Sequence, residues 1–172
     1  MSTIHQSINQ PTSSVLDSGD LLNFINSHGL DAAILPMKDP TPTVAAAAEA
    51  LHVEPHQVIK SLVFKVGKEP LMVITSGLAR VDRKMLASYL GVGRNKVKFA
   101  DSDNALEITG YIVGSMPPFG HRTRLRTVLD AATARQSEIY GGGGDIDAMM
   151  RLSVEELVRV TEAEIIPISE SR

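Results

Sequence analysis

The sequence predicts a mixed α/β domain of the α+β type, in which helices flank a partly closed sheet of about seven strands. The chain has 172 residues, of which 43% are hydrophobic, enough for one domain with a sizeable core. Short β-like runs and helical segments follow one another in irregular order, so a doubly wound parallel sheet is not expected. Neither an internal repeat nor a linker divides the chain.

Helices are expected where apolar residues recur three or four positions apart after a capping residue. Ser18 precedes one such segment, which Gly29 ends. Ser153 and Glu156 form a capping-box pattern that opens another. The full set of expected helices is the segment after Ser18, Val44–Leu51 after Thr43, Val81–Leu90 before Gly91, the segment from Asp101 or Ser102 to Ile108, and Val154–Thr161.

Strands are expected where short β-branched or apolar runs are bounded by turn residues. Lys60–Val66 and Leu71–Thr75, joined by Gly67–Pro70, predict a hairpin. The other candidates are Ala32–Leu35, Lys96–Ala100, Tyr111–Val113, Thr127–Leu129, Glu138–Tyr140, Ala148–Leu152 and Ile165–Ile168. The polar residues 1–17 predict a disordered N-terminal arm before a single domain at 18–172.

The composition excludes several classes of protein. The chain has no cysteine, so disulfides, thiolate zinc sites and a cysteine nucleophile are ruled out. No apolar run approaches the ~20 residues that cross a bilayer, and the polar start is not a signal peptide. We therefore expect a cytoplasmic protein without a membrane partner.

The charge distribution is more informative than the net charge of −3, which argues against a general nucleic-acid binder such as a DNA-binding protein. Between Lys60 and Arg126 there are twelve Lys/Arg and five Asp/Glu, whereas the flanks are acidic. A basic middle indicates a local site for a polyanion. Scatter of these charges over several solvated faces explains the pattern equally well.

Two motifs favour structural interpretations. His52 and His56 have the spacing of helical metal ligands, but Pro55 interrupts the helix that this spacing needs, so we expect surface histidines and no metal site. The run Gly141–Gly144 lacks the Lys and Ser/Thr of a phosphate-binding loop. It predicts a flexible turn between strands, with backbone that can border a cleft.

Two polar residues lie at the ends of the predicted hairpin. Ser76 precedes Gly77 at a strand end, but a serine nucleophile needs a base, and no triad is evident. Ser76 is therefore expected to line a cleft. Lys60 enters an apolar run, where a lysine either protects a sheet edge or points into a pocket. The residues themselves leave both alternatives open.

The segment from Gly114 to Gly120 is the most unusual in the chain, because two glycines bracket two prolines directly after an apolar run. Prolines fix φ and remove N–H donors, so the remaining amides can be held rigidly. Those of Gly114, Ser115 and Met116 would then suit an oxyanion or a carbonyl oxygen. The alternative is a stiff loop that only turns the chain.

Several segments in the same order resemble the YbaK/ProX family of aminoacyl-tRNA deacylases, which are related to the editing domain of bacterial prolyl-tRNA synthetases. The resemblance covers the chain from Leu30 to the C-terminus. The matching segments are Val58–Phe64, Thr75–Gly77, Val81–Ala87, Thr109–Gly120 and Ser153–Val160.

The resemblance implies a barrel-like sheet and a metal-free, cofactor-free enzyme that hydrolyses the ester of a mischarged tRNA. The lysine that corresponds to Lys60 is the key residue, and Gly114–Pro118 corresponds to the GxxxP loop. The expected site combines the catalytic residues Lys60 and Gly114 with the substrate-binding residues Ser76, Gly77, Ser115, Met116, Pro117, Pro118, Phe119, Gly120 and His121.

The expected substrate is a small amino acid, such as Cys, Ala, Ser or Thr, on tRNA(Pro), edited in trans. The expected partners are the tRNA acceptor end and prolyl-tRNA synthetase or another synthetase. The histidine of alanine-specific prolyl editors is not carried over, because Tyr140–Met149 contains none. The alternative function is a catalytically silent tRNA-binding module associated with a synthetase.

Overall fold

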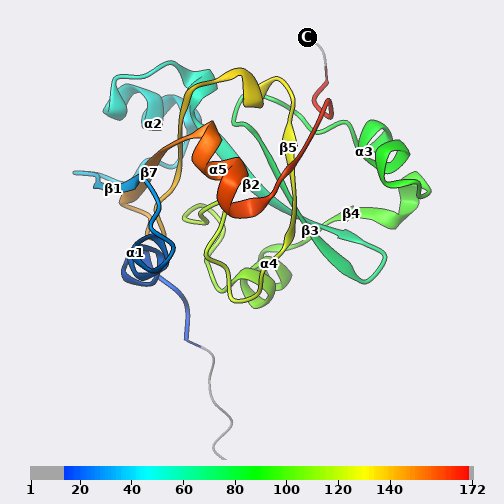
Figure 1. Cartoon of the computed structure of the whole chain (residues 1–172), viewed down its shortest axis with the longest axis horizontal. Coiled ribbons are helices and arrows are strands. Elements are labelled where there is room, and N and C mark those ends of the chain that lie inside the picture. The colour runs from blue at the N-terminus through cyan, green and yellow to red at the C-terminus, as the bar shows by residue number, and fades with distance from the viewer. Residues whose placement is uncertain (1–13, 171–172) are drawn as a thin grey trace, which may run out of the picture.

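The computed structural model describes residues 14–170, which form five α-helices and eight strands (Figure 1). The helices are α1 (Ser18–Ser27), α2 (Val44–Leu51), α3 (Arg83–Leu90), α4 (Ser102–Thr109) and α5 (Val154–Thr161). The strands are β1 (Ala32–Pro36), β2 (Ile59–Val66), β3 (Glu69–Ser76), β4 (Val97–Phe99), β5 (Arg126–Asp130), β6 (Glu138–Gly142), β7 (Ala148–Ser153) and β8 (Glu164–Ile166).

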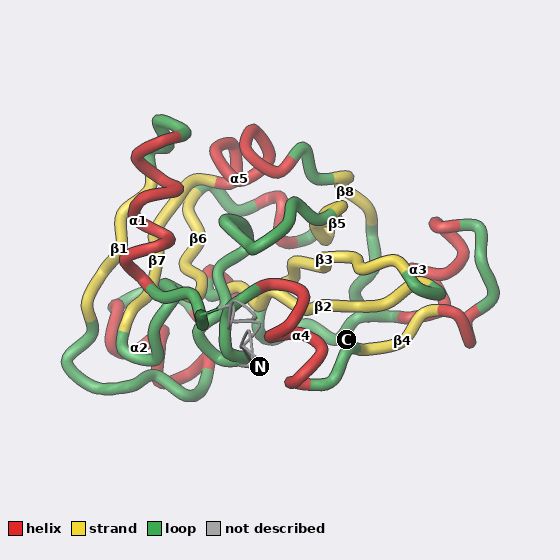
Figure 2. Tube along the Cα trace, turned by 90° about the horizontal axis from the view of Figure 1, so that it is seen from below, coloured by secondary structure: helices red, strands yellow, loops and turns green. Residues whose placement is uncertain are grey.

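The strands form two sheets, so the prediction of a mixed α+β fold is confirmed but that of one barrel-like sheet is not. One sheet has the order β4-β2-β3-β5-β8, and the other has the order β1-β7-β6. The predicted β2–β3 hairpin is antiparallel, whereas β3, β5 and β8 run parallel to one another. Within residues 14–170, one isolated bridge, between Val58 and Tyr140, joins the sheets, and neither sheet closes on itself. The two sheets lie side by side (Figure 2).

Helices cover both faces of the three-stranded sheet. Successive strand residues point to opposite faces. Ile139 of β6 packs in one cluster with Leu21 of α1, whereas its neighbour Tyr140 packs in another with Ala47 of α2. Helices α1 and α2 therefore lie on opposite sides of this sheet, as Figure 1 shows. Helix α5 shares the side of α1 and contributes the fully buried Leu157.

The predicted strand at residues 111–113 is wrong, because this segment is irregular and leads into a turn at residues 113–115. Gly110 and Gly114 on either side of it have φ values of +86° and +100°, which bend the chain away from an extended path. Tyr111 is fully buried, while Ile112 and Val113 are half exposed. Of these three apolar residues, one is thus packed in the core and two lie at the surface.

Other predicted boundaries shift for local reasons. Strand β8 ends at Ile166, because the amide of Ile168 donates to the Asp130 carboxylate instead of a strand partner. Ser153 caps α5 as expected, but Glu156 does not complete a capping box and accepts from the amide of Asp31.

The N-terminal boundary also differs from its prediction. Asp17, rather than Ser18, caps α1 in a reciprocal capping box with Asp20. Leu16 packs against the main core cluster. Residues 14–17, which the sequence assigned to the arm, thus belong to the described structure, and the rest of that arm lies outside the described residues.

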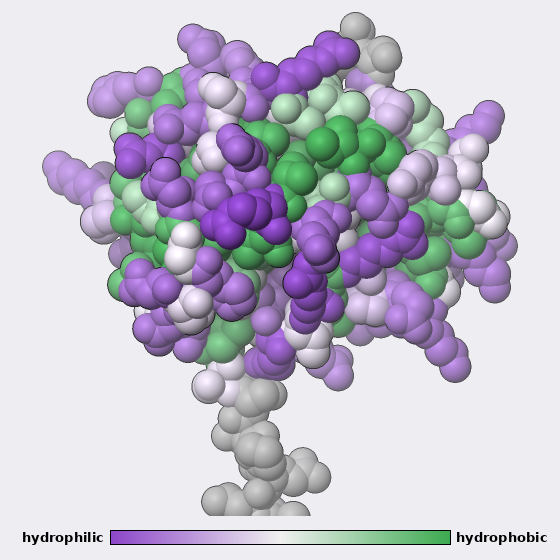
Figure 3. Space-filling view, in the orientation of Figure 1, coloured by the Kyte–Doolittle hydropathy of each residue, from purple (hydrophilic) through white to green (hydrophobic). Residues whose placement is uncertain are grey.

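The face seen in Figure 1 carries mainly hydrophilic side chains, with hydrophobic ones in patches between them (Figure 3). Within residues 14–170 no helix has the length and apolar character needed to cross a membrane.

Tyr111 allows a test of how the turn is anchored. Its ring is fully buried and its hydroxyl has no hydrogen-bond partner within residues 14–170, and this burial raises its pKa. Removing an unpaired buried hydroxyl costs little, so Tyr111→Phe should keep or raise the midpoint of thermal unfolding. Tyr111→Ala should lose about 3–5 kcal/mol of stability. A marked loss in Tyr111→Phe would show that the hydroxyl is paired in solution.

Candidate active site

A cleft of about 460 Å³ lies where the start of α2, the start of β2 and the loop after Tyr111 meet. It is lined by both residues predicted to be catalytic, Lys60 and Gly114. Met116 and Gly142 also contribute, and the segment before α2 closes one side with Thr43. The fold thus brings together two residues that lie far apart in the sequence.

Lys60 lies on a stretch of β2 that is only partly covered. On its sheet, Lys60 is opposite Thr75 of β3. On the other side of β2, strand β4 pairs only from Phe64 to Val66. The lysine side chain is exposed and has no ion pair within residues 14–170. It is therefore available to an anionic ligand in the cleft.

One of the three amides predicted to bind an oxyanion, that of Ser115, is already hydrogen-bonded within the turn before the prolines. The Ser115 amide and hydroxyl both donate to the carbonyl oxygen of Ile112, at 3.1 and 2.9 Å. The amides of Gly114 and Met116 have no hydrogen-bond partner within the described part of the chain. Gly114 is exposed, and a Cβ there would meet open space, so its φ of +100° is what requires glycine.

The glycine run packs against this loop. Gly144 donates its amide to the Ser115 carbonyl oxygen at 2.9 Å. A Cβ at Gly142 would overlap the Met116 carbonyl oxygen, so only glycine allows β6 to come this close to the loop. Gly141 and Gly142 belong to β6, so only Gly143 and Gly144 lie in the predicted turn between strands, and Gly142 borders the cleft as expected. The contacts of the glycine run are tight, which the sequence did not indicate.

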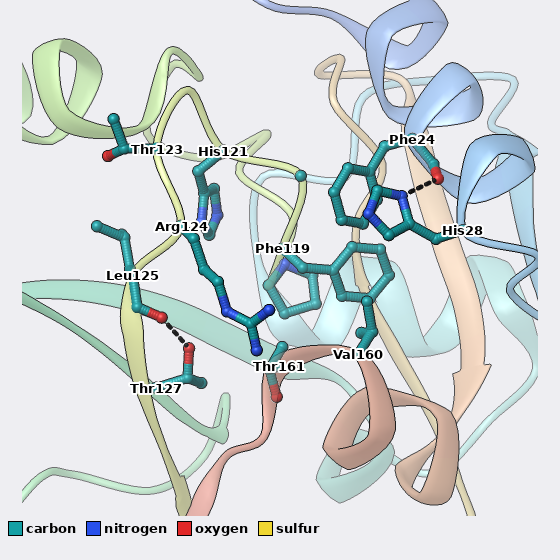
Figure 4. Close-up of a pocket in the computed structure, with 12 residues that line it drawn as sticks. Phe24, His28, Phe119, His121, Thr123, Arg124, Leu125, Thr127, Val160 and Thr161 are labelled. Carbon is teal, nitrogen blue, oxygen red and sulfur yellow. Dashed lines mark hydrogen bonds between the residues drawn. The ribbon is translucent and has the colours of Figure 1, made fainter.

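The later part of the loop lines a separate cavity of about 170 Å³ between α1 and α5. Pro118, Phe119, Gly120 and His121 lie there and not in the main cleft. Figure 4 shows Phe24 and His28 stacked at one side, with their ring centroids 3.9 Å apart, and the Arg124 side chain extending across the cavity. The predicted substrate-binding set is thus divided between pockets.

His121 holds the loop from inside. Its Nε2–H donates to the Pro117 carbonyl oxygen at 2.8 Å. Burial lowers the pKa of His121 to about 4, although the hydrogen bond to Pro117 opposes this effect. The ring is therefore neutral at pH 7. This geometry gives His121 a structural contact to the loop.

Ser76 and Gly77 lie beside the cleft. The Ser76 amide donates to the Thr133 hydroxyl at 2.8 Å, and Ser76 lines a neighbouring pocket of about 280 Å³. Gly77 donates to the Val58 carbonyl oxygen at 2.7 Å. A Cβ at Gly77 would overlap the side chain of Val44, so this glycine allows α2 to pack against the end of β3.

Sequence reasoning missed the contribution of residues 41–44 and Met149 to the cleft. It indicated Thr43 only as a helix cap, and Met149 resembles any core methionine. His52 and His56 are exposed, and no cluster of potential metal ligands occurs within residues 14–170.

Two of the six arginines in the basic middle segment, Arg124 and Arg126, form ion pairs. Arg126 makes a bidentate ion pair with Glu164, which together with the Tyr89 hydroxyl lowers the Glu164 pKa to about 2. Arg124 contacts Glu162 at 2.7 Å, and Arg122 donates to backbone carbonyls. Their charges therefore contribute less to a polyanion site than the sequence alone implies.

The cleft thus combines an exposed lysine with a backbone loop at Gly114 and Met116. The aminoacyl-tRNA editing domain family matches residues 38–160, more than half of the chain. The chain therefore belongs to this family, and it is an aminoacyl-tRNA deacylase that acts in translation fidelity.

Curated relatives agree with this assignment. The chain is 28% identical over 115 residues to the multifunctional Ser/Thr-tRNA deacylase ProXp-y of Escherichia coli (strain K12), covering 64% of this chain and 68% of that protein. It is 28% identical over 116 residues to the uncharacterized protein YwhH of Bacillus subtilis (strain 168), covering 67% and 72%. It is also 34% identical over 101 residues to the proline–tRNA ligase of Limosilactobacillus fermentum, covering 54% of this chain and 17% of the ligase.

A solved structure has the same fold. A protein described as a candidate trans-editing enzyme for prolyl-tRNA synthetase has a TM-score of 0.83 and 26% identity, covering 95% of this chain and 100% of that one.

The contact at Gly142 predicts an asymmetry between neighbouring glycines. Gly142→Ala forces the Met116 backbone to move and should cost about 1–3 kcal/mol of stability and displace the loop. Gly141→Ala is the matched control, because its Cβ would meet side chains and no backbone, those of Ile59 at 3.1 Å and Pro118 at 3.7 Å. Urea unfolding of the two variants measures the difference. Equal stabilities would mean that the loop does not pack on β6 in solution.

The pKa of His121 predicts a pH dependence of stability. The unfolded chain, with a histidine pKa near 6.5, binds this proton more readily than the folded protein, whose His121 pKa is about 4. Stability should therefore fall as the pH falls from 6.5 towards 4, by at most ~1.4 kcal/mol per unit. His121→Gln keeps a donor for Pro117 without titrating. Urea unfolding should show a smaller loss between pH 7 and pH 5 in this variant.

Proposed function

We propose that this protein hydrolyses the ester of tRNAs mischarged with a small amino acid, among Cys, Ala, Ser and Thr, with tRNA(Pro) as the tRNA. The observation that carries the proposal is that Lys60 and Gly114 line one cleft. The name of the E. coli relative favours Ser and Thr within this set. The match to a proline–tRNA ligase favours tRNA(Pro) and supports association with that synthetase.

Lys60 acts as a compact cation in this mechanism. Its ammonium group binds the terminal phosphate or ribose and so places the ester in the cleft. Because the side chain is exposed and unpaired within residues 14–170, no internal ion pair has to be broken first.

The loop supplies the electrostatic part of the mechanism. The amides of Gly114 and Met116 donate to the carbonyl oxygen as it becomes an oxyanion, while the Ser115 amide keeps the turn closed. Water attacks the ester carbon, and the tRNA ribose oxygen leaves. One such donor contributes about 3 kcal/mol, or 10²–10³ in rate.

The rim of the cleft sets the size of the amino acid. Val44, Val58 and Met149 line it with apolar surface. Such a wall excludes large side chains by overlap but discriminates weakly among small ones, because one methylene is worth only ~1–3 kcal/mol. A panel of mischarged tRNAs carrying Ala, Cys, Ser or Thr identifies the preferred substrate.

The two rival functions make different predictions. A catalytically silent tRNA-binding module would bind mischarged tRNA without hydrolysing it. A hydrolase for small esters would process aminoacyl-adenosine as well as the full aminoacyl-tRNA. Comparing these substrates with purified protein separates the three functions.

Lys60→Ala should lower the single-turnover deacylation rate by about 10² or more, since it removes the cation that positions the ester. The thermal midpoint should stay unchanged because the side chain is exposed. Lys84→Ala, an exposed lysine on α3, is the matched control and should keep the wild-type rate. A folded Lys60→Ala protein with the wild-type rate would refute the proposed role of Lys60.

A further inference from the structure

Lys60 is the first of three polar residues in a row across the five-stranded sheet. It lies opposite Thr75 of β3. The parallel register of β3 and β5 pairs Val73 with Val128 and Ile74 with Leu129, so the next pair along the strands is Thr75 beside Asp130. The backbones of Lys60 and Asp130 are thus separated by two strand spacings, or roughly 10 Å.

All three residues lie on the same face of this sheet. Side chains alternate between faces, so Thr75 shares its face with Val73, and Asp130 with Val128. Val73 and Val128 pack in one core cluster, whereas Ile74 and Leu129 pack in the other. Cross-strand neighbours on one face are close enough for their side chains to interact.

The two inner members of the row are buried and incompletely paired. Thr75 is fully buried and Asp130 is 1% exposed. Asp130 Oδ1 accepts from the amides of Ile168 and Ser169, at 3.0 and 3.2 Å. Asp130 Oδ2 and the Thr75 hydroxyl have no hydrogen-bond partner within residues 14–170. Buried polar atoms without partners are costly, and a donor and an acceptor here lie on neighbouring strands.

We propose that Thr75 and Asp130 are positioning residues for Lys60. The Thr75 hydroxyl turns to donate its proton to Asp130 Oδ2, and its oxygen then accepts from the Lys60 ammonium group. The chain of hydrogen bonds restrains a flexible lysine at the cleft while leaving its other protons for the substrate. This inference rests on the proposed function of Lys60.

A purely structural role does not account for this arrangement. The segment after β8 is held by two amides that donate to Asp130 Oδ1, so Oδ2 is not needed for this contact. The Thr75 hydroxyl makes no hydrogen bond within residues 14–170. Valine has the same shape as threonine, so Thr75→Val should not lower the stability. An effect of Thr75→Val on catalysis without an effect on unfolding therefore distinguishes positioning from folding.

The test measures single-turnover deacylation of the mischarged tRNA preferred in the panel, with thermal unfolding measured in parallel. Thr75→Val should lower the rate at saturating enzyme about tenfold or more, with half-saturation and the thermal midpoint nearly unchanged. Thr75→Ser should restore the rate because it returns the hydroxyl. Asp130→Asn keeps an acceptor for Ile168 and Ser169 and should lower the rate in the same way.

A double-mutant cycle tests whether the effect of Thr75→Val on the deacylation rate acts through Lys60. Thr75→Val should have no further effect in the Lys60→Ala background, because residues of one network are not additive. Wild-type rates in Thr75→Val together with an inactive Lys60→Ala would overturn this inference and leave the proposed function standing. Additive losses in the double variant would also overturn it. A fully active Lys60→Ala would overturn the proposed function itself.

Discussion

The close approach of β6 to the 114–118 loop is the contact on which the site depends. Gly142 lies against the Met116 carbonyl, and Gly144 donates to the Ser115 carbonyl, so the loop is held by backbone contacts on a strand. A strand of the three-stranded sheet thereby fixes a loop that faces β2 of the other sheet. Because the Val58–Tyr140 bridge joins the same two sheets, the loop and Lys60 are positioned by connected elements.

The same loop separates two environments. Gly114 and Met116 line the cleft on the side of α2, whereas Phe119 and His121 line the cavity between α1 and α5. The fully buried Tyr111 anchors the loop in the core, and the neutral His121 donates to the Pro117 carbonyl oxygen from the neighbouring cavity. The backbone amides of Gly114 and Met116 thus border the cleft, while the side chains that anchor the loop pack outside it.

In the proposed mechanism, backbone amides and one lysine carry out the hydrolysis of an activated ester. Positioning and oxyanion donors can lower the barrier of a reactive ester without a nucleophilic side chain. Three glycines shape this site. Gly114 has a positive φ, while Gly77 and Gly142 allow neighbouring elements to pack closely. Each of these positions excludes a side chain for a different physical reason.

The sequence by itself determined the type of most elements, the hairpin that carries Lys60, and the family to which the motifs belong. Those features follow from local periodicity, caps and turn residues, and from segments such as residues 109–120. It could not decide between the edge and pocket positions of Lys60, nor foresee that residues 111–113 are irregular between two glycines of positive φ. The resemblance placed Lys60 and Gly114 in one site, but only the tertiary structure showed the cleft that they line, placed His121 in another cavity, and aligned Thr75 with Asp130. Strand register and the packing of two sheets make these contacts, and both depend on residues distant in the chain.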